Sequence, residues 1–248
     1  MRGQRVLTIL GMHRSGTSSL AGSLEDAGLY LGGQDVAGAG RWNAKGNRES
    51  RTLMRLHEEL LDANGGSWRR PPATVRWDDA FRARRDRFIR SRSLEPYWGS
   101  KDPRTLLLID GWLEALPELA MVATVRDPRA VAGSLERRHR NGSVDEWLEL
   151  WLVYNRRLLE LQSEHGFSVV DFDLPADRYQ RRLATLVAEL GLDPPSSEGA
   201  FFETSRRTAP VPPPPPQPPE LAQVHPHHDR DAPPHSHTHT RESPKHPK

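Results

Sequence analysis

Proline is distributed unevenly along this chain of 248 residues, and the distribution limits which part of the chain can fold. Of the 22 prolines, 13 lie in the last 40 residues, which also hold seven of the 11 histidines. Because proline fixes φ and removes a backbone donor, such a segment is unsuited to helices and central strands. Its composition is typical of polyproline II and disordered chain. We therefore expect one folded domain over residues 1–208, the length of a single α/β domain, and a disordered tail over residues 209–248.

The composition also excludes several classes of protein. The absence of cysteine excludes disulfides, thiolate zinc sites and a cysteine nucleophile. The longest apolar runs, at 6–10, 106–109 and 119–125, are far shorter than the ~20 residues that span a bilayer, and the first is too short for a signal-peptide core. A formal net charge of +2 is too small to indicate nucleic-acid binding. We therefore expect a soluble, cytoplasmic protein with no membrane span and no nucleic-acid partner, and no oligomeric state is indicated.

The histidines of the tail are the one feature that suggests a metal. They alternate with other residues at 235–239 and could hold a metal ion loosely. A solvated tail is the simpler interpretation of the same composition, so no metal site is expected.

Short apolar segments alternate with amphipathic ones along residues 5–190, a pattern that predicts a parallel sheet with right-handed crossovers. Strands are expected at 5–10, 97–101, 119–125 and 167–172. Helices are expected at 17–27, 47–64 (with Asn47 as N-cap), 78–94, 128–140, 144–165 and 178–190, while residues 105–116 fit either a helix or a buried strand. The expected fold class is α/β, with a central parallel sheet between two layers of helices, as in phosphate-loop proteins.

The segment Gly11-Met-His-Arg-Ser-Gly16-Thr17-Ser18 lies between the first expected strand and the first expected helix. Two glycines five residues apart let a backbone wrap around an anion, and a helix N-terminus directs free N–H groups at it. A nucleotide triphosphatase has Lys after the second glycine. Here Thr17 stands at that position and the cation, Arg14, lies inside the loop. We therefore expect a phosphate-like ligand bound by Arg14, Ser15, Gly16, Thr17 and Ser18.

A second segment, Arg126-Asp-Pro-Arg-Ala-Val-Ala-Gly-Ser134, follows the expected strand at 119–125. Ligands of α/β sheets bind at the carboxyl ends of the strands, where Arg126 is expected, and Pro128 is expected to begin a helix that faces the same crevice. The loop and this segment together resemble the 5′-phosphosulfate and 3′-phosphate motifs of the sulfotransferase family, in which an Arg and a Ser eight residues later hold the 3′-phosphate. Taken alone, Arg126 fits a helix-capping ion pair with Asp127 equally well.

The resemblance extends from about residue 5 to residue 207 through weaker matches such as Lys101-Asp-Pro-Arg104. It implies transfer of a sulfuryl group from 3′-phosphoadenosine 5′-phosphosulfate to a hydroxyl or amine of a small-molecule or glycan acceptor. The Lys-Gly-x-x-Gly segment of cytosolic eukaryotic members is absent, and Arg206 or Arg207 could replace it.

Four residues are candidates for the chemistry that the resemblance implies. Arg14 and Lys101 are the expected cations, although Lys101 fits an ion pair with Asp102 equally well. Glu49 is the first candidate for the general base, because carboxylate-using sulfotransferases place a Glu after the phosphate loop; a first-turn acid that stabilises a helix dipole is the alternative. His13, inside the loop, is the second candidate. His57 is expected to be solvated. Asp102 is the third and least favoured candidate for the general base.

Two other functions compete with this interpretation. A phosphate-loop kinase or nucleotide hydrolase is suggested by residues 106–110, which imitate an apolar strand ending in a Mg²⁺-binding Asp. A non-catalytic nucleotide-binding scaffold is suggested by the proline-rich tail, which could bind domains with aromatic grooves.

Overall fold

The computed structural model describes residues 4–36, 46–139 and 141–194. The expected tail at 209–248 and the candidate donor-binding residue Arg207 lie outside the described residues.

Four parallel strands form the sheet of the described chain, in the order β2-β1-β3-β4. They are β1 (Arg5–Leu10), β2 (Tyr97–Lys101), β3 (Ala120–Val125) and β4 (Ser168–Asp171). In register, Ile9 lies opposite Lys101, and Val125 lies opposite Asp171. Because all strands are parallel, their carboxyl ends lie at one edge, which brings the two sequence motifs together. The predicted parallel sheet is confirmed.

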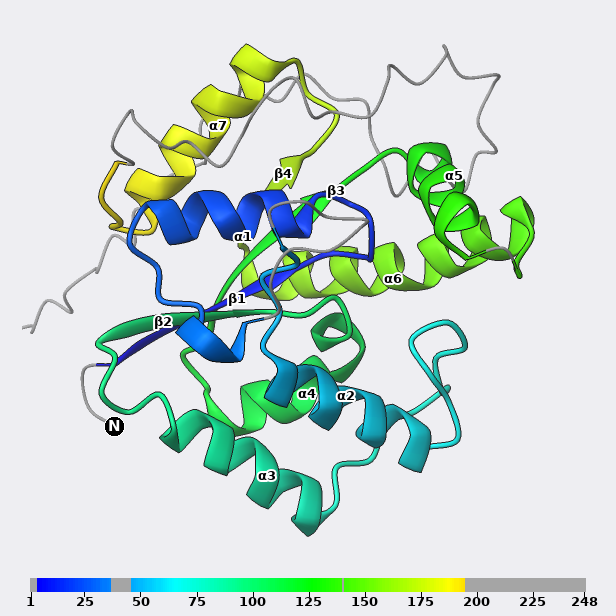
Figure 1. Ribbon diagram of the computed structural model, residues 1–248, viewed down its shortest axis with the longest axis horizontal. Helices are drawn as coiled ribbons and strands as arrows, with labels where there is room; N and C mark the ends of the chain where they lie inside the picture. Colours follow the sequence, from blue (N-terminus) through cyan, green and yellow to red (C-terminus); the bar gives the residue numbers. More distant parts are fainter. Residues whose placement is uncertain (1–3, 37–45, 140, 195–248) are drawn as a thin grey trace, which may run out of the picture.

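Helices cover both faces of the sheet (Figure 1). Alternate residues of β1 point to opposite faces: Leu7 and Ile9 pack with α1 (Thr17–Asp26) and α7 (Ala176–Glu189). On the other face Val6 and Leu10 belong to a core cluster shared by the remaining helices, of which α6 is the longest. These helices are α2 (Arg51–Ala63), α3 (Asp79–Arg90), α4 (Thr105–Ala115), α5 (Pro128–Arg138) and α6 (Val144–His165). A short 3₁₀ turn, η1 (Gly33–Asp35), follows α1.

Some predicted boundaries were wrong. The N-cap of α2 is Ser50, whose hydroxyl accepts from the Leu53 N–H at 3.1 Å, so the cap lies three residues later than the expected Asn47. Residues 105–116, left open between helix and strand, form α4. Helix α7 begins at Ala176, two residues earlier than expected. Within the described ranges, none of the helices combines the length and the apolar character needed to cross a membrane.

Candidate functional site

The loop between β1 and α1 has the backbone conformation that its glycines predict. Gly16 has a φ of 93° at the N-cap of α1 and Arg14 a φ of 69°, both in the left-handed region. Ser15 donates to the Met12 carbonyl at 2.6 Å, and its own carbonyl accepts from the Thr124 hydroxyl on β3 at 3.0 Å. Among the described residues no side chain caps the first turn of α1, and the Ser19 N–H donates to the Gly16 carbonyl at 2.9 Å, so the N–H groups of Thr17 and Ser18 are the ones available to an anion.

Arg14 lies in a cluster of positive charge and forms no ion pair of its own within the described residues. Its Nε donates to the Ser134 hydroxyl on α5 at 2.8 Å, and within the described ranges no carboxylate forms an ion pair with it. Burial and repulsion from three neighbouring guanidiniums lower the pKa of Arg14 to about 10. These neighbours are Arg138, Arg126 and Arg137. A cluster of this kind is stabilised by an anionic ligand.

Arg126 is at the carboxyl end of β3, as predicted, but its ion-pair partner is not Asp127. The Arg126 Nε lies 3.3 Å from the Asp173 carboxylate, and Nη1 donates to the Arg14 carbonyl at 3.4 Å. Asp127 instead caps α5 by accepting from the N–H groups of residues 129 and 130. Its own N–H donates to Asp173 at 2.6 Å. Arg126 and Ser134 therefore both contact Arg14, which brings the two predicted motifs together.

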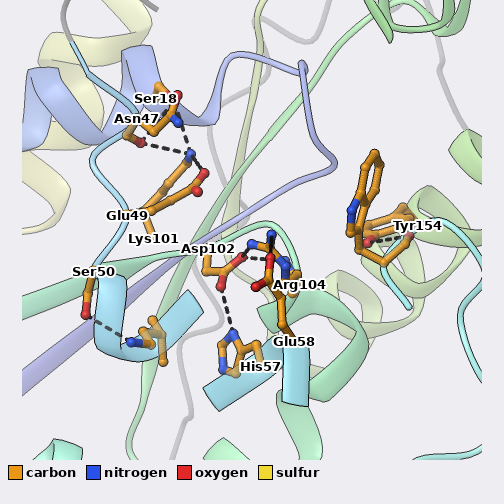
Figure 2. Close-up of polar contacts among 12 residues, drawn as sticks. Ser18, Asn47, Glu49, Ser50, His57, Glu58, Lys101, Asp102, Arg104 and Tyr154 are labelled. Atoms are coloured by element: carbon orange, nitrogen blue, oxygen red, sulfur yellow. Dashed lines mark hydrogen bonds and ion pairs between the residues drawn. The ribbon is translucent and has the colours of Figure 1, made fainter. Parts of the chain in front are cut away.

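Lys101 ends β2 and forms a buried ion pair with Glu49 (Figure 2). The Lys101 Nζ lies 2.6 Å from Glu49 Oε1 and also donates to the Ser18 hydroxyl at 3.1 Å and to the Asn47 carbonyl at 3.0 Å. The side chains of the pair are only 2% and 9% exposed. The predicted alternative, an ion pair between Lys101 and Asp102, was wrong. The structure thus joins Glu49, Lys101 and Ser18, three of the predicted site residues, at the first turn of α1.

His13 extends from the loop toward aromatic side chains. Its ring centroid lies 4.3 Å from that of Trp68 and 6.2 Å from that of Tyr154 on α6. Burial lowers the pKa of His13 well below its ordinary value, and the nearby Arg104 guanidinium adds to this effect, so the ring is neutral at neutral pH. Its Nε2 is buried and has no hydrogen-bond partner among the described residues. His13 is therefore a neutral ring beside the loop.

His57 was expected to be solvated, and this prediction was wrong. The residue is fully buried, and its Nδ1 lies 3.0 Å from Asp102 Oδ2. Although burial favours the protonated carboxyl, the hydrogen bond from His57 and the charge of Arg104 hold the pKa of Asp102 well below its usual range. Asp102 is therefore a buried, ionised carboxylate with partners of its own, and it has no role as the partner of Lys101.

The segment that suggested a nucleotide hydrolase is not a strand. Residues 106–110 belong to α4, and Asp110 pairs with Arg157 at 2.5 Å with 79% of its side chain exposed. An exposed helical carboxylate away from the strand ends cannot hold Mg²⁺ at a phosphate loop. In the part of the chain that the structure describes, no group of three or more His, Asp or Glu side chains is arranged to hold a metal ion.

A cavity of about 540 Å³ lies between the segment after α2 and the start of α6. Its lining includes Arg69, Arg70 and Asn141 with the buried Trp147. Arg69 stacks on the Trp147 ring at 4.4 Å and donates to Asn141 Oδ1 at 3.0 Å. Trp68, which contacts His13, also lies 6.4 Å from Trp147 in a stacked arrangement. Aromatic rings thus connect the loop to this cavity.

Comparisons with solved structures identify the fold. The chain is similar to the sulfotransferase domain of the olefin synthase from Synechococcus PCC 7002, with 21% identity and a TM-score of 0.50 over 90% of this chain and 95% of that one. It also matches a sulfotransferase from Mycobacterium tuberculosis H37Rv, with 16% identity and a TM-score of 0.37 over 76% of this chain and 66% of that one. No family model and no curated protein matches the sequence. The first likeness shows that the chain has the fold of a sulfotransferase domain, which confirms the predicted fold class.

Proposed function

We propose that this protein is a sulfotransferase that moves a sulfuryl group from 3′-phosphoadenosine 5′-phosphosulfate to a hydroxyl or amine acceptor. The observation that carries the proposal is the contact between Arg14 and Ser134, which joins the phosphate loop to the second motif. Within the described ranges Arg14 has guanidinium neighbours and no carboxylate partner. A donor with phosphate groups at both ends would supply the missing negative charge.

Each end of the donor has its own candidate contacts. The 5′-phosphosulfate would be bound by the N–H groups of the loop and of the first turn of α1, with the hydroxyls of Ser15, Thr17 and Ser18. The 3′-phosphate would be bound by Arg126, just before the N-cap of α5, and by Ser134 in the second turn of that helix. Arg14 would contribute positive charge between the two ends. Arg207, outside the described residues, is a further candidate contact of the donor.

The transfer step needs a developing negative charge to be stabilised and a proton to be removed. The acceptor oxygen or nitrogen forms a bond to sulfur while the bond from sulfur to the bridging oxygen breaks. The leaving group is 3′-phosphoadenosine 5′-phosphate. Lys101 and Arg14 would stabilise the charge that develops on the bridging oxygen. Glu49 would accept the proton that the acceptor loses, and the neutral His13 is the second candidate for that role.

Lys101 would be shared between Glu49 and the donor. The Lys101 amine lies 2.6 Å from the Glu49 carboxylate. If the phosphosulfate oxygens bind the same amine, the carboxylate would lose part of that interaction and could contact the acceptor. Donor binding would therefore make Glu49 available to the acceptor.

The acceptor is proposed to be a small molecule or a glycan that approaches from the cavity beside Trp147. Its lining combines an aromatic ring with guanidinium, amide and carboxylate groups, which suits a ligand that carries several hydroxyls. Trp68 and His13 would form the wall between this cavity and the loop.

Calorimetric titration with 3′-phosphoadenosine 5′-phosphate and with ATP plus Mg²⁺ tests the proposal. We expect the bisphosphate to bind without metal and ATP to bind weakly, because Thr17 occupies the Lys position and Asp110 is on α4. Tight binding of ATP without binding of the bisphosphate would favour the kinase or hydrolase. Transfer of labelled sulfuryl to a panel of carbohydrate, lipid and phenolic acceptors then separates an enzyme from a scaffold.

A further inference from the structure

Three polar links join the start of α2 to the end of β2 (Figure 2). Glu49 pairs with Lys101 at 2.6 Å, His57 pairs with Asp102 at 3.0 Å, and Glu58 pairs with Arg104 at 2.6 Å. The residues on one side fall within positions 49–58, and those on the other side within positions 101–104. We call these three pairs the α2–β2 links. Only the first of them contains residues with a role in the proposed transfer.

The middle link is fully buried and its proton positions follow from its partners. The Trp112 indole N–H can only donate, and it lies 3.0 Å from His57 Nε2, so that nitrogen is the acceptor. The proton of the neutral ring is then on Nδ1, which donates to Asp102 Oδ2. The other Asp102 oxygen accepts from the Arg104 N–H at 3.0 Å and from Arg104 Nη1 at 2.9 Å. Both side chains of the middle link are thus held in one orientation.

Burying a carboxylate between a helix and a strand carries a large desolvation penalty. Apolar side chains of similar volume often stabilise a core as well as a buried charged network does, whereas hydrogen bonds define one orientation and one register. Core contacts already attach α2, because Leu53, Leu56 and Leu60 are buried on the same helix. The feature that apolar packing would not provide is the register of Glu49 against Lys101.

Covalent geometry connects the middle link to the first one. Asp102 directly follows Lys101, and His57 lies two helical turns after Ser50, the N-cap that follows Glu49. A fixed distance between His57 and Asp102 therefore fixes where the segment at 47–50 meets the end of β2. That segment also supplies the Asn47 carbonyl, which accepts from both Lys101 and Ser18.

We propose that His57 and Asp102 are positioning residues that hold Glu49 against Lys101 without touching donor or acceptor. The catalytic meaning of this role depends on the proposed function, but the positioning itself does not. Loss of the hydrogen bond from His57 to Asp102 allows α2 to shift along β2, which opens the pair of Glu49 and Lys101. Loss of the exposed outer link, whose Glu58 side chain is 54% exposed, leaves that pair in place.

Chemical labelling of Lys101 measures the position of the pair directly. The chain has only four lysines, at 45, 101, 245 and 248, so peptides that report Lys101 are distinguished by mass. With an amine-reactive reagent under native conditions, we expect Lys101 of the full-length protein to be labelled slowly, because it is buried and bonded to three acceptors. The Glu49→Gln variant removes the ion pair and gives the reference labelling rate for Lys101 without its carboxylate partner.

A matched pair of variants at residue 57 separates positioning from a general structural role. Asn places an N–H donor where His has Nδ1 and can keep the bond to Asp102, whereas Gln places its terminal group near Nε2 and cannot. We expect His57→Gln to label Lys101 about 10-fold faster than His57→Asn, at similar melting temperature. Glu58→Gln is the control and should label Lys101 at the rate of the unmodified sequence.

The proposal is overturned if folded His57→Gln protein protects Lys101 as well as His57→Asn does. If His57→Gln does not fold, the isosteric Asp102→Asn variant carries the same expectation of faster labelling, and protection of Lys101 there is equally contrary. Titration with 3′-phosphoadenosine 5′-phosphate is run alongside. Failure of the unmodified protein to bind it counts against the proposed function, while the labelling rates still decide the positioning role.

Discussion

The guanidinium of Arg14 donates to the hydroxyl of Ser134 at 2.8 Å, although 120 residues separate them in the sequence. Arg14 belongs to the loop after β1, and Ser134 lies on α5. The contact connects the site proposed for the 5′-phosphosulfate with the site proposed for the 3′-phosphate. The two residues should therefore act on donor binding as one unit.

Ser134→Ala and Arg14→Ala should weaken binding of 3′-phosphoadenosine 5′-phosphate, each by about 10-fold or more, since each removes a hydrogen bond to a charged group. Because the two side chains contact each other, the losses should not add in the double variant. Calorimetric titration of the four proteins measures the coupling. Ser168→Ala, which removes a hydroxyl bonded to Glu189, is the control. Strictly additive losses would show that the contact is irrelevant to binding.

Arg126→Ala should reduce affinity for 3′-phosphoadenosine 5′-phosphate by about 100-fold, because a charge-assisted phosphate contact is lost. Affinity for adenosine 5′-phosphate, which lacks the 3′-phosphate, should change much less. The matched control is Arg182→Ala on α7, whose guanidinium pairs with Glu189 at 3.1 Å. An equal loss for both nucleotides would indicate that Arg126 supports the loop, through its contact with the Arg14 carbonyl, and does not recognise phosphate.

Glu49→Gln should leave binding of the bisphosphate nearly intact and lower the turnover of an identified acceptor by about 10²- to 10⁴-fold, the range of general-base catalysis. Glu58→Gln changes a nearby carboxylate, on α2, that is paired with Arg104, and should leave turnover near that of the unmodified protein. Steady-state kinetics with the labelled donor provide the measurement. Unchanged turnover in Glu49→Gln would move the role of base to His13.

The buried carboxylate of Asp102 should make part of the stability depend on pH. Its pKa is held below that of the unfolded chain, so its contribution is fully present above the ordinary value of about 3.9 and is lost as pH falls toward the folded value. At pH 7, Asp102→Asn should lower the free energy of unfolding by about 3 kcal/mol or more, since it disrupts a buried charged network. Urea unfolding at pH 7 and pH 3 should show the difference between the two proteins shrinking at the lower pH. A difference that is constant with pH would contradict this account of Asp102.

The elements of the fold were predictable because they are encoded locally. Glycines 11 and 16 and the apolar run before them define the strand, loop and helix, and the placement of Arg126 follows from the strand before it. Partners distant in sequence were not predictable: nothing local to Lys101 indicates Glu49, 52 residues earlier, and nothing local to Arg126 indicates Asp173. The local sequence also cannot decide whether Asn47 or Ser50 caps α2, because both side chains can accept from a backbone N–H.

The burial of His57 could have been found from the sequence. It lies four residues after Leu53 and three before Leu60, on the apolar stripe that predicted the helix itself. A polar residue on such a stripe is buried and needs partners. The identity of those partners depends on which strand the stripe meets, which becomes clear only from the three-dimensional arrangement of α2 and β2.

The backbone at Arg126 is supported independently of its own side chain. The Trp151 indole donates to its carbonyl at 3.0 Å, and the next N–H is bonded to Asp173. An exchange of the residue at position 126 should therefore alter the chemistry offered to a ligand while the indole of Trp151 still holds the backbone there. For protein engineering, position 126 would then be a place to alter binding of the proposed nucleotide one functional group at a time. Over evolutionary time, the same independence would let a lineage acquire a different donor before any other part of the scaffold adapts.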